Sequence, residues 1–320
     1  MEPLQFHPIL KRYLWGGRRL GELLNKPIEA GDDYAESWEV ADLPGDESVV
    51  ASGKFAGQSI RQLLNTHREE LLGIHADRIR FPLLIKFLDA NRDLSIQVHP
   101  GQEMAQRYPE VTTGKAEMWV ILDAQPGSRI YAGLKEGVSR EQFSDAIKNS
   151  TVPDCMHIIE TKAGDCFFLK PGTVHSLGTG LLVAEIQQPN NVTYRIDDWG
   201  RKGPDGKTRE LHLELGLEAT DFSTGPIAPL QPKPLGNETR STELVNNEYF
   251  VVHQHQGEMT YEPDDDRRAH VLMLLSGTAS TTNSTIGSLT KGETLVLPAD
   301  RDRFSLQLSP DAHLLDAFLN

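Results

Sequence analysis

The chain has 320 residues, of which 38% are hydrophobic and 24% charged, which is ordinary for a globular protein of one large or two modest domains. Its formal net charge of −14 argues against a nucleic-acid partner, because such proteins carry a basic face. It also means that an anionic substrate must be attracted by a few local Lys and Arg residues. The sequence has no apolar run of the roughly 20 residues that cross a bilayer and no signal-peptide pattern at its start, so we expect a cytoplasmic protein without a membrane partner.

Short apolar stretches separated by Gly, Pro, Asn and Asp predict a β-rich fold over most of the first 220 residues. Helical patterns interrupt this region at 59–72, from Ser139, and at about 209–217. Gly73 is placed as a C-cap of the first helix, and Ser139 and Gln142 form a capping box at the start of the second. The strands expected here are 37–42, 83–88, 94–98, 117–123, 166–169, 181–187 and 192–196.

Residues 226–239 belong to a Pro- and Gly-rich stretch without periodicity, which predicts a linker between a first domain at 1–225 and a second at 240–320. Strands are expected in the second domain at 249–253, 270–275, 294–297 and 304–308. The segments 163–175 and 291–304 both run from Gly and an acid through an apolar strand to Pro, a pattern similar to that of cupin jelly rolls. The first copy ends in His175, whereas the second has no His at the matching place.

These patterns predict a mainly β protein with two unequal parts. We expect a cupin jelly roll with helical insertions in the first domain. We expect a smaller, degenerate, cupin-like C-terminal β domain that binds no metal and covers one side of the first.

Polar side chains alternate with apolar ones along two of the expected strands. Ser95, Gln97 and His99 share one face of the strand at 94–98, and Lys115 and Glu117 share a face of the next. A polar face that points into a barrel needs a metal or a sugar to satisfy it, because buried unpaired polar groups are costly. Taken alone, each motif is more typical of a structural role: the first of a strand face in water, the second of a solvated surface ion pair.

Four side chains together suggest a metal site. With only two cysteines in the chain, a metal must be held by His, carboxylate or amide oxygen. Gln97, His99, Glu117 and His175 supply an amide, a carboxylate and two imidazoles, the last after a Pro-Gly turn that can aim it back into a barrel. Two His and one carboxylate form the ligand set of catalytic zinc and of non-haem iron, and the sequence leaves both open.

Several longer motifs resemble the successive signatures of type I phosphomannose isomerase (mannose-6-phosphate isomerase), in its shorter bacterial branch. They occur in the order of that family and cover nearly all of residues 1–220, whereas residues 240–320 resemble the branch only loosely. The motifs are YLWGG (13–17), ESWEVAD (36–42), FPLLIKFLDANRDLSIQVHP (81–100), GKAEMWVILDA (114–124), LKPGTVHSLGTGLLVAEIQQPNNVTYRIDDWGR (169–201) and RELHLE (209–214).

This resemblance implies a zinc enzyme that interconverts mannose 6-phosphate and fructose 6-phosphate through an enediol. It implies one Zn²⁺ per chain, with Gln97, His99, Glu117 and His175 at the ligand positions. Arg195 matches an active-site arginine, and Lys115 matches a proposed acid-base lysine. The positions that line the sugar-phosphate pocket of the family are matched by Lys86, Ser95, Arg201 and Trp15.

The sequence leaves other interpretations open. Some family members have an acid where this chain has Asn190 and Asn191, so a mechanism that needs that acid is in doubt. Rival functions are an isomerase of another sugar, an iron cupin oxygenase, or a sugar-binding cupin with a structural metal. Arg195 and Lys115 disfavour the last, because a binding module needs no acid-base group. The sequence decides neither the general base nor whether the protein is a monomer or a dimer.

Overall fold

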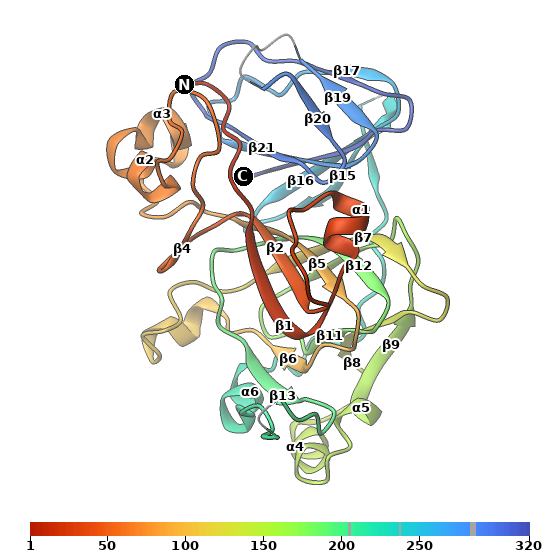
Figure 1. The fold of residues 1–320 in the computed structure, drawn as a ribbon. Helices are drawn as coiled ribbons and strands as arrows, with labels where there is room; N and C mark the ends of the chain where they lie inside the picture. Colours follow the sequence, from red (N-terminus) through yellow and green to blue (C-terminus); the bar gives the residue numbers. More distant parts are fainter. Residues whose placement is uncertain (204–205, 237, 282–285) are drawn as a thin grey trace.

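The computed structural model describes residues 1–203, 206–236, 238–281 and 286–320, and it confirms a mainly β protein (Figure 1). Antiparallel sheets face one another in two stacked parts, with the C-terminal part in blue at one end of the molecule and the helices α4 (Arg140–Lys148), α5 (Val152–Cys155) and α6 (Leu213–Ala219) at the other. Among the described residues, the structure has no helix long and apolar enough to span a membrane.

The first part of the chain forms a barrel from a first and a second sheet. The first sheet has the order β1 (Ile9–Gly17), β2 (Tyr34–Val40), β5 (Leu84–Ala90), β12 (Leu181–Gln187), β7 (Glu117–Ala124), β10 (Cys166–Leu169). The second sheet has the order β13 (Tyr194–Asp197), β6 (Ile96–Val98), β11 (His175–Leu177), β8 (Arg129–Leu134), β9 (Met156–Glu160). A short β3–β4 ribbon (Asp42–Leu43 and Asp46–Glu47) lies outside these sheets.

Apolar residues fill one end of the barrel between these sheets. Ile121 and Val183 from the first sheet contact the same cluster as Ile130 and Leu177 from the second. The outer face of the second sheet is covered by α4, α5 and α6, in a separate cluster that contains Phe143. The barrel interior is therefore closed at one end by packing, which leaves the opposite end for a cavity.

The C-terminal part is a second pair of sheets. The third sheet has the order β14 (Lys233–Leu235), β15 (Glu238–Asn246), β16 (Val251–Gln256), β23 (His313–Phe318), β18 (His270–Ser276), β21 (Thr294–Leu297). The fourth has the order β17 (Met259–Tyr261), β22 (Leu306–Leu308), β19 (Thr278–Ser280), β20 (Ser288–Thr290).

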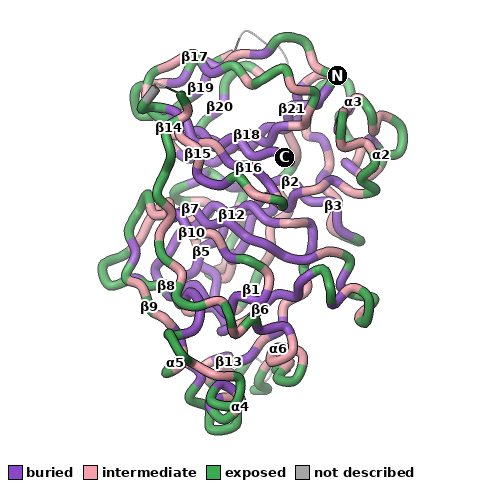
Figure 2. Tube along the Cα trace, turned by 180° about the vertical axis from the view of Figure 1, so that it is seen from behind, coloured by how far each residue is buried: buried purple, intermediate pink, exposed green. Residues whose placement is uncertain are grey.

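The third sheet packs against the outer face of the first. Phe87 and Met118 of the first sheet belong to one buried cluster with Met273 and Leu315 of the third. The cluster also takes in α1 (Arg19–Leu24), α2 (Ile60–Thr66) and α3 (Arg68–Leu72). Figure 2 shows the result as buried strands through the middle of the molecule. The first sheet is therefore covered on its apolar face by the C-terminal part, while its other face looks into the barrel.

Some elements differ from expectation. The helix predicted at 59–72 is broken at His67, whose φ of −135° is not helical, and a short 3₁₀ turn η1 (Gly73–His75) follows α3. The last predicted helix, at 209–217, begins later, at Leu213, as α6. Part of the predicted linker pairs as a strand, because β14 joins β15, although residue 237 lies outside the described residues. A further 3₁₀ turn, η2 (Gln102–Gln106), follows β6.

Candidate active site and metal centre

A polar cavity of about 280 Å³ opens at the end of the barrel that the apolar cluster leaves free. Side chains from both sheets line it. The first sheet contributes Glu36, Lys86, Glu117, Trp119 and Glu185, and the second contributes Gln97, His175 and Arg195. The cavity therefore gathers residues that lie far apart in the sequence, from Tyr13 to Arg209.

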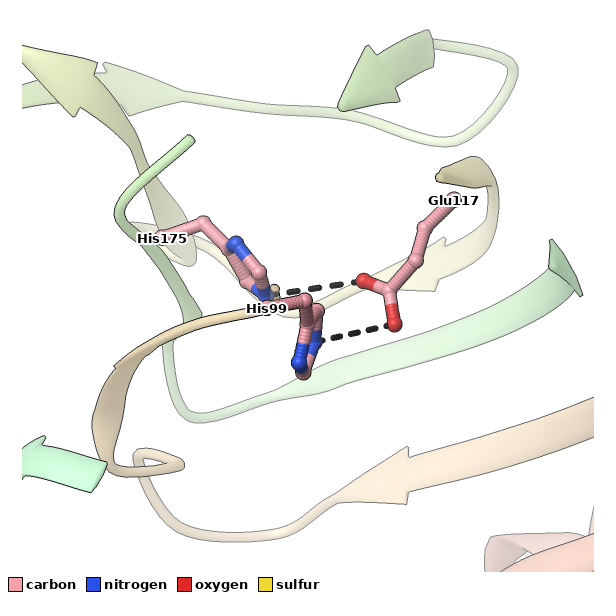
Figure 3. A group of neighbouring side chains, drawn as sticks. All are labelled: His99, Glu117 and His175. Carbon is pink, nitrogen blue, oxygen red and sulfur yellow. Dashed lines mark ion pairs between the residues drawn. The ribbon is translucent and has the colours of Figure 1, made fainter. Parts of the chain in front are cut away.

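His99, Glu117 and His175 form a buried group in which imidazole and carboxylate atoms converge (Figure 3). His99 Nε2 lies 3.1 Å from Glu117 Oε1, and His175 Nε2 lies 3.5 Å from Glu117 Oε2. One ligand atom from each residue lies within 4.8 Å of the others, and every side chain is about 98% buried. This separation and burial are those of a group that could hold one metal ion.

Backbone carbonyls orient both imidazoles. His99 Nδ1 lies 3.0 Å from the carbonyl of Val192, and His175 Nδ1 lies 2.8 Å from the carbonyl of Thr173. A carbonyl only accepts, so each Nδ1 donates, and each Nε2 keeps its lone pair when the ring is neutral. Metal-binding histidines are held in this way, with the second nitrogen fixing the tautomer.

The protonation states also suit a metal. Burial and the nearby Lys115 ammonium lower the pKa of His99 to about 3, and burial lowers the pKa of His175. Burial opposes ionisation of Glu117, but Lys115 and His99 outweigh it and hold the pKa of Glu117 well below its usual range. Neutral imidazoles and an ionised carboxylate are the forms that bind a divalent cation, so the residues present fit the metal that the sequence suggested.

Gln97 lies beside this group. It pairs with His175 on β11 and with Arg195 on β13, and its Nε2 lies 3.5 Å from His175 Nε2. Its Oε1 accepts a hydrogen bond of 3.1 Å from Ser95. A half-turn of the amide would bring its oxygen toward the imidazole, which is the orientation that a metal ligand needs.

Lys115 lies among the same atoms. Its Nζ is 3.0 Å from Glu117 Oε1 and 3.2 Å from His99 Nε2, and its side chain is 3% exposed. The ammonium therefore neutralises Glu117 in this structure. A group that carries a mobile proton so close to the ligand atoms is suited to acid-base work.

Lys86 is held between two carboxylates on the wall of the first sheet. Its Nζ lies 3.2 Å from Glu185 and 3.4 Å from Glu36. Burial opposes its charge, but Glu185 and Glu36 outweigh burial and raise the pKa of Lys86. Burial, together with the nearby Glu117 charge, raises the pKa of Glu185 to about 8.

The sequence did not single out Glu36 or Glu185. Glu185 lies between the apolar residues Ala184 and Ile186, so polar alternation was a possible signal there, whereas Glu36 is followed by the polar Ser37. Their meeting with Lys86 depends on strand pairing, since Glu185 is opposite Lys86 on one side and Trp119 on the other.

Arg195 and Arg209 line a second part of the cavity, whereas Arg201 does not. Arg195 donates to the carbonyl of Glu210 at 2.8 Å, and its buried Nε has no hydrogen-bond partner within the described part of the chain. Burial and the neighbouring Arg209 lower the pKa of Arg195. Arg201, which the sequence placed at the sugar-phosphate pocket, is not among the residues that line this cavity, and its guanidinium contacts Asp198. Arg209, which the sequence did not single out, takes a place in the lining.

Aromatic and small polar residues complete the lining. Trp15 lies there with Tyr13, and the two rings stack at a centroid distance of 5.7 Å. Ser95 also lines the cavity, and its side chain is buried. Asn191 is another lining residue. Asn190 is buried beside it and donates to the carbonyl of Thr113, so it fixes the backbone of the adjoining loops.

Comparison with known proteins identifies similar sequences. The family model of the type I phosphomannose isomerase catalytic domain matches residues 4–116. The chain is 34% identical over 252 residues to the mannose-6-phosphate isomerase ManA of Bacillus subtilis, an alignment that covers 78% of each chain. It is 32% identical over 302 residues to the mannose-6-phosphate isomerase of Streptococcus mutans, covering 93% of this chain and 92% of the relative.

Solved structures share the fold. The crystal structure of the mannose 6-phosphate isomerase from Bacillus subtilis aligns with a TM-score of 0.89 and 27% identity over 99% of both chains. A putative mannosephosphate isomerase from Archaeoglobus fulgidus aligns with a TM-score of 0.78 over 100% of this chain and 99% of the other, and at 21% identity it shows the fold alone. The expected jelly-roll architecture with a second β part therefore recurs over the whole length of these proteins.

Proposed function

The chain belongs to the type I phosphomannose isomerase family, and on that premise we propose that it interconverts mannose 6-phosphate and fructose 6-phosphate through an enediol. The observation that carries this proposal is the buried His99–Glu117–His175 group, which shares a cavity with Lys115 and Arg195. The reaction moves a proton between two adjacent carbons, so it needs an acid-base group and a stabiliser of oxygen charge close together. The cavity supplies both kinds of group.

We propose that His99, Glu117 and His175, with Gln97, bind one zinc ion per chain. Zinc bound there would supply Lewis-acid polarisation of the substrate oxygens. The remaining steps belong to side chains of the protein. Lys115 and Glu185 are the groups that can take up or return the proton, and Arg195 can donate hydrogen bonds to the developing oxygen charge.

The cavity wall also suits a sugar. Trp15 presents an aromatic ring at the cavity, and Ser95 places a hydroxyl beside Gln97. Lys86 is held by Glu36 and Glu185, so its role in the proposal is to bind sugar hydroxyls and to set the charge of Glu185. The cytoplasm remains the predicted location.

A coupled assay tests the function directly. Purified protein should convert mannose 6-phosphate to fructose 6-phosphate under anaerobic conditions and should turn over free mannose poorly. Oxygen-dependent turnover would favour the iron oxygenase, and equal efficiency on mannose would overturn the choice of substrate. Failure to act on either sugar would contradict the isomerase assignment.

Removing an imidazole tests the metal site. His99→Ala and His175→Ala should each lose most of the bound zinc and nearly all activity, because either change leaves too few ligands. His7→Ala, which removes an exposed histidine, is the matched control. Elemental analysis of the purified proteins reports the zinc, and full occupancy in both site variants would disprove the assignment.

A further inference from the structure

Two arginines, Arg201 and Arg209, contact one buried aspartate, Asp198, and Arg209 also lines the cavity. Arg201 uses every nitrogen of its side chain on protein acceptors. Its Nε donates to the Asp198 carbonyl at 3.2 Å, its Nη1 donates to the carbonyl of Asp93, and its Nη2 contacts Asp198 Oδ1. These bonds use three of its five N–H groups, and Arg201 is not among the residues that line the cavity, so its effect in this arrangement is to fix Asp198.

Arg209 uses only part of its guanidinium on the same aspartate. Its Nε donates to Asp198 Oδ2 at 2.8 Å, and its Nη2 donates to Oδ1. Its Nη1 makes no hydrogen bond to any of the residues that the structure describes, although Arg209 lines the cavity. Asp198 is 5% exposed, so it holds the Arg209 fork in one orientation with a free edge. Such a planar fork is suited to the oxygens of a phosphate.

The local charges favour binding of an anion near Arg209 rather than near Lys86. Lys86 Nζ is already held by two carboxyl groups, those of Glu36 and Glu185, so its ammonium is paired within the protein. Around Asp198, by contrast, Arg201 and Arg209 share one carboxylate, and Arg195 lies close enough for Arg209 to depress its pKa. In a protein of net charge −14, a dianionic group must find such a local cationic site.

The arrangement also indicates how a substrate would be oriented in the cavity. Arg195 is opposite Gln97 on the paired strands β13 and β6, which places it next to the metal group. Among charged neighbours, Lys115 and Glu117 affect the pKa of His99 most, whereas the charge of Arg209 affects the pKa of Arg195. Arg195 thus lies between the reacting end of the cavity and Arg209.

We propose that Arg209, positioned by Asp198, binds the phosphate group of the sugar substrate, while Arg201 positions Asp198 and does not contact substrate. The proposal rests on the proposed function for the identity of the sugar. Inorganic phosphate itself would also bind Arg209, because the recognised chemistry is that of a tetrahedral oxyanion.

Direct binding to the metal-loaded protein tests the proposal. Isothermal titration calorimetry would give Kd values for mannose 6-phosphate, free mannose and inorganic phosphate. For Arg209→Ala we expect binding of mannose 6-phosphate and of phosphate to weaken about 10- to 100-fold, the scale of a lost charge-assisted hydrogen-bonding group, with mannose binding unchanged. Arg209→Lys keeps the charge but loses the fork, so it should give an intermediate loss. Arg303→Ala, which removes an exposed arginine of the C-terminal part, controls for the change in net charge.

Each alternative result has a definite meaning. Equal phosphate affinity in Arg209→Ala and Arg303→Ala would overturn the proposal, as would an equal loss of mannose binding in Arg209→Ala. Should Arg209→Ala fail to fold by circular dichroism, the Arg209→Lys comparison decides in the same way. If the wild type binds phosphate through Arg209 but does not isomerise the sugar, the proposed function fails and the phosphate site stands.

Discussion

Arg195 lies opposite Gln97 across β13 and β6, and its side chain lines the same cavity as Glu117 and His175 of the metal group. If it stabilises oxygen charge in the transition state, Arg195→Lys should lower kcat on the order of 100-fold, because lysine lacks the bidentate fork. The KM for mannose 6-phosphate should change much less. Steady-state kinetics separate the two parameters, and a near-normal kcat with a large rise in KM would make Arg195 a binding residue.

Glu185 offers a test of the proton-transfer step. Burial and the Glu117 charge raise its pKa to about 8, and a bound cation would lower the pKa from that value. A carboxylate that takes up a proton must be ionised, so kcat/KM should rise with pH through the pKa of Glu185. Glu185→Gln should remove this rise and lower kcat by roughly 10²- to 10⁴-fold, the usual contribution of general acid-base catalysis.

The comparison for this experiment is Glu36→Gln. Glu36 is the other carboxylate beside Lys86, so its loss disturbs the same ammonium while leaving Glu185 in place. The pH–rate profile of Glu36→Gln should keep its rising limb. If Glu185→Gln also keeps the limb, Glu185 is not the base and Lys115 becomes the better candidate.

At the level of single residues, strand alternation was enough to predict which side chains of one strand share a face. Lys115, Glu117 and Trp119 face the cavity side, and Ala116, Met118 and Val120 join the cluster on the opposite face. Alternation describes one strand, however, and the contacts of Lys86 with Glu36 and Glu185 depend on which strands pair and in which register. The position of Arg201 outside the cavity depends on Asp198 in the same way.

Among the elements, helix α4 has a reciprocal cap that the sequence predicted. The Ser139 hydroxyl accepts from the Gln142 backbone, and the Gln142 side chain accepts from the Ser139 backbone at 2.8 Å. Ser139→Ala should lower the free energy of unfolding by about 1 kcal/mol, because a backbone donor of the first turn loses its partner. Urea unfolding would report the change, and isomerase activity should stay at the wild-type level since α4 lies outside the cavity.

The matched control for the cap is Ser52→Ala. Ser52 is an exposed serine in a bend, so the substitution removes a hydroxyl of the same kind outside a helix. Stabilities that fall equally in both variants would show that the hydroxyl, and not its capping position, matters.

Element boundaries were harder to predict than element types. The periodic leucines of 59–72 predicted one helix, and Leu63 and Leu72 are indeed buried in one cluster, yet the chain breaks at His67. The His67 side chain contacts Glu70 one turn later, at 2.8 Å. This break keeps the apolar spacing approximately intact, so hydrophobic periodicity cannot reveal it.

At the scale of the whole molecule, the first sheet connects the cavity to the C-terminal part. Its inward side chains include Lys86 and Glu185, while Phe87 and Ala184 on the other face pack in the cluster that contains Met273. The sequence predicted that the C-terminal part would cover one side of the first domain. It did not show which sheets would meet, because side-chain periodicity gives no information about a partner sheet.

The C-terminal part contains a buried polar cluster of its own. His270 Nδ1 lies 2.9 Å from Asp316, His270 Nε2 lies 3.2 Å from Asp266, and Tyr261 donates to Asp316 at 2.9 Å. Asp316, which lies 46 positions after His270, contacts it because β18 and β23 pair. Burial alone would lower the pKa of His270, but Asp316 and Asp266 outweigh burial and raise it to about 9.

This cluster predicts how stability depends on pH. The folded pKa of His270, about 9, lies above its ordinary value of 6.5, so the stabilisation is fully present below pH 6.5 and is lost as the pH rises through 9. It amounts to about 3 kcal/mol at most, from the size of the shift. Urea unfolding of the wild type and of His270→Gln at pH 6 and pH 9.5 should therefore show a difference in stability that shrinks at the higher pH. His7→Gln replaces an exposed histidine and should show no such pH-dependent difference. A difference between wild type and His270→Gln that stays constant over this range would mean that His270 does not carry the charge in the folded protein.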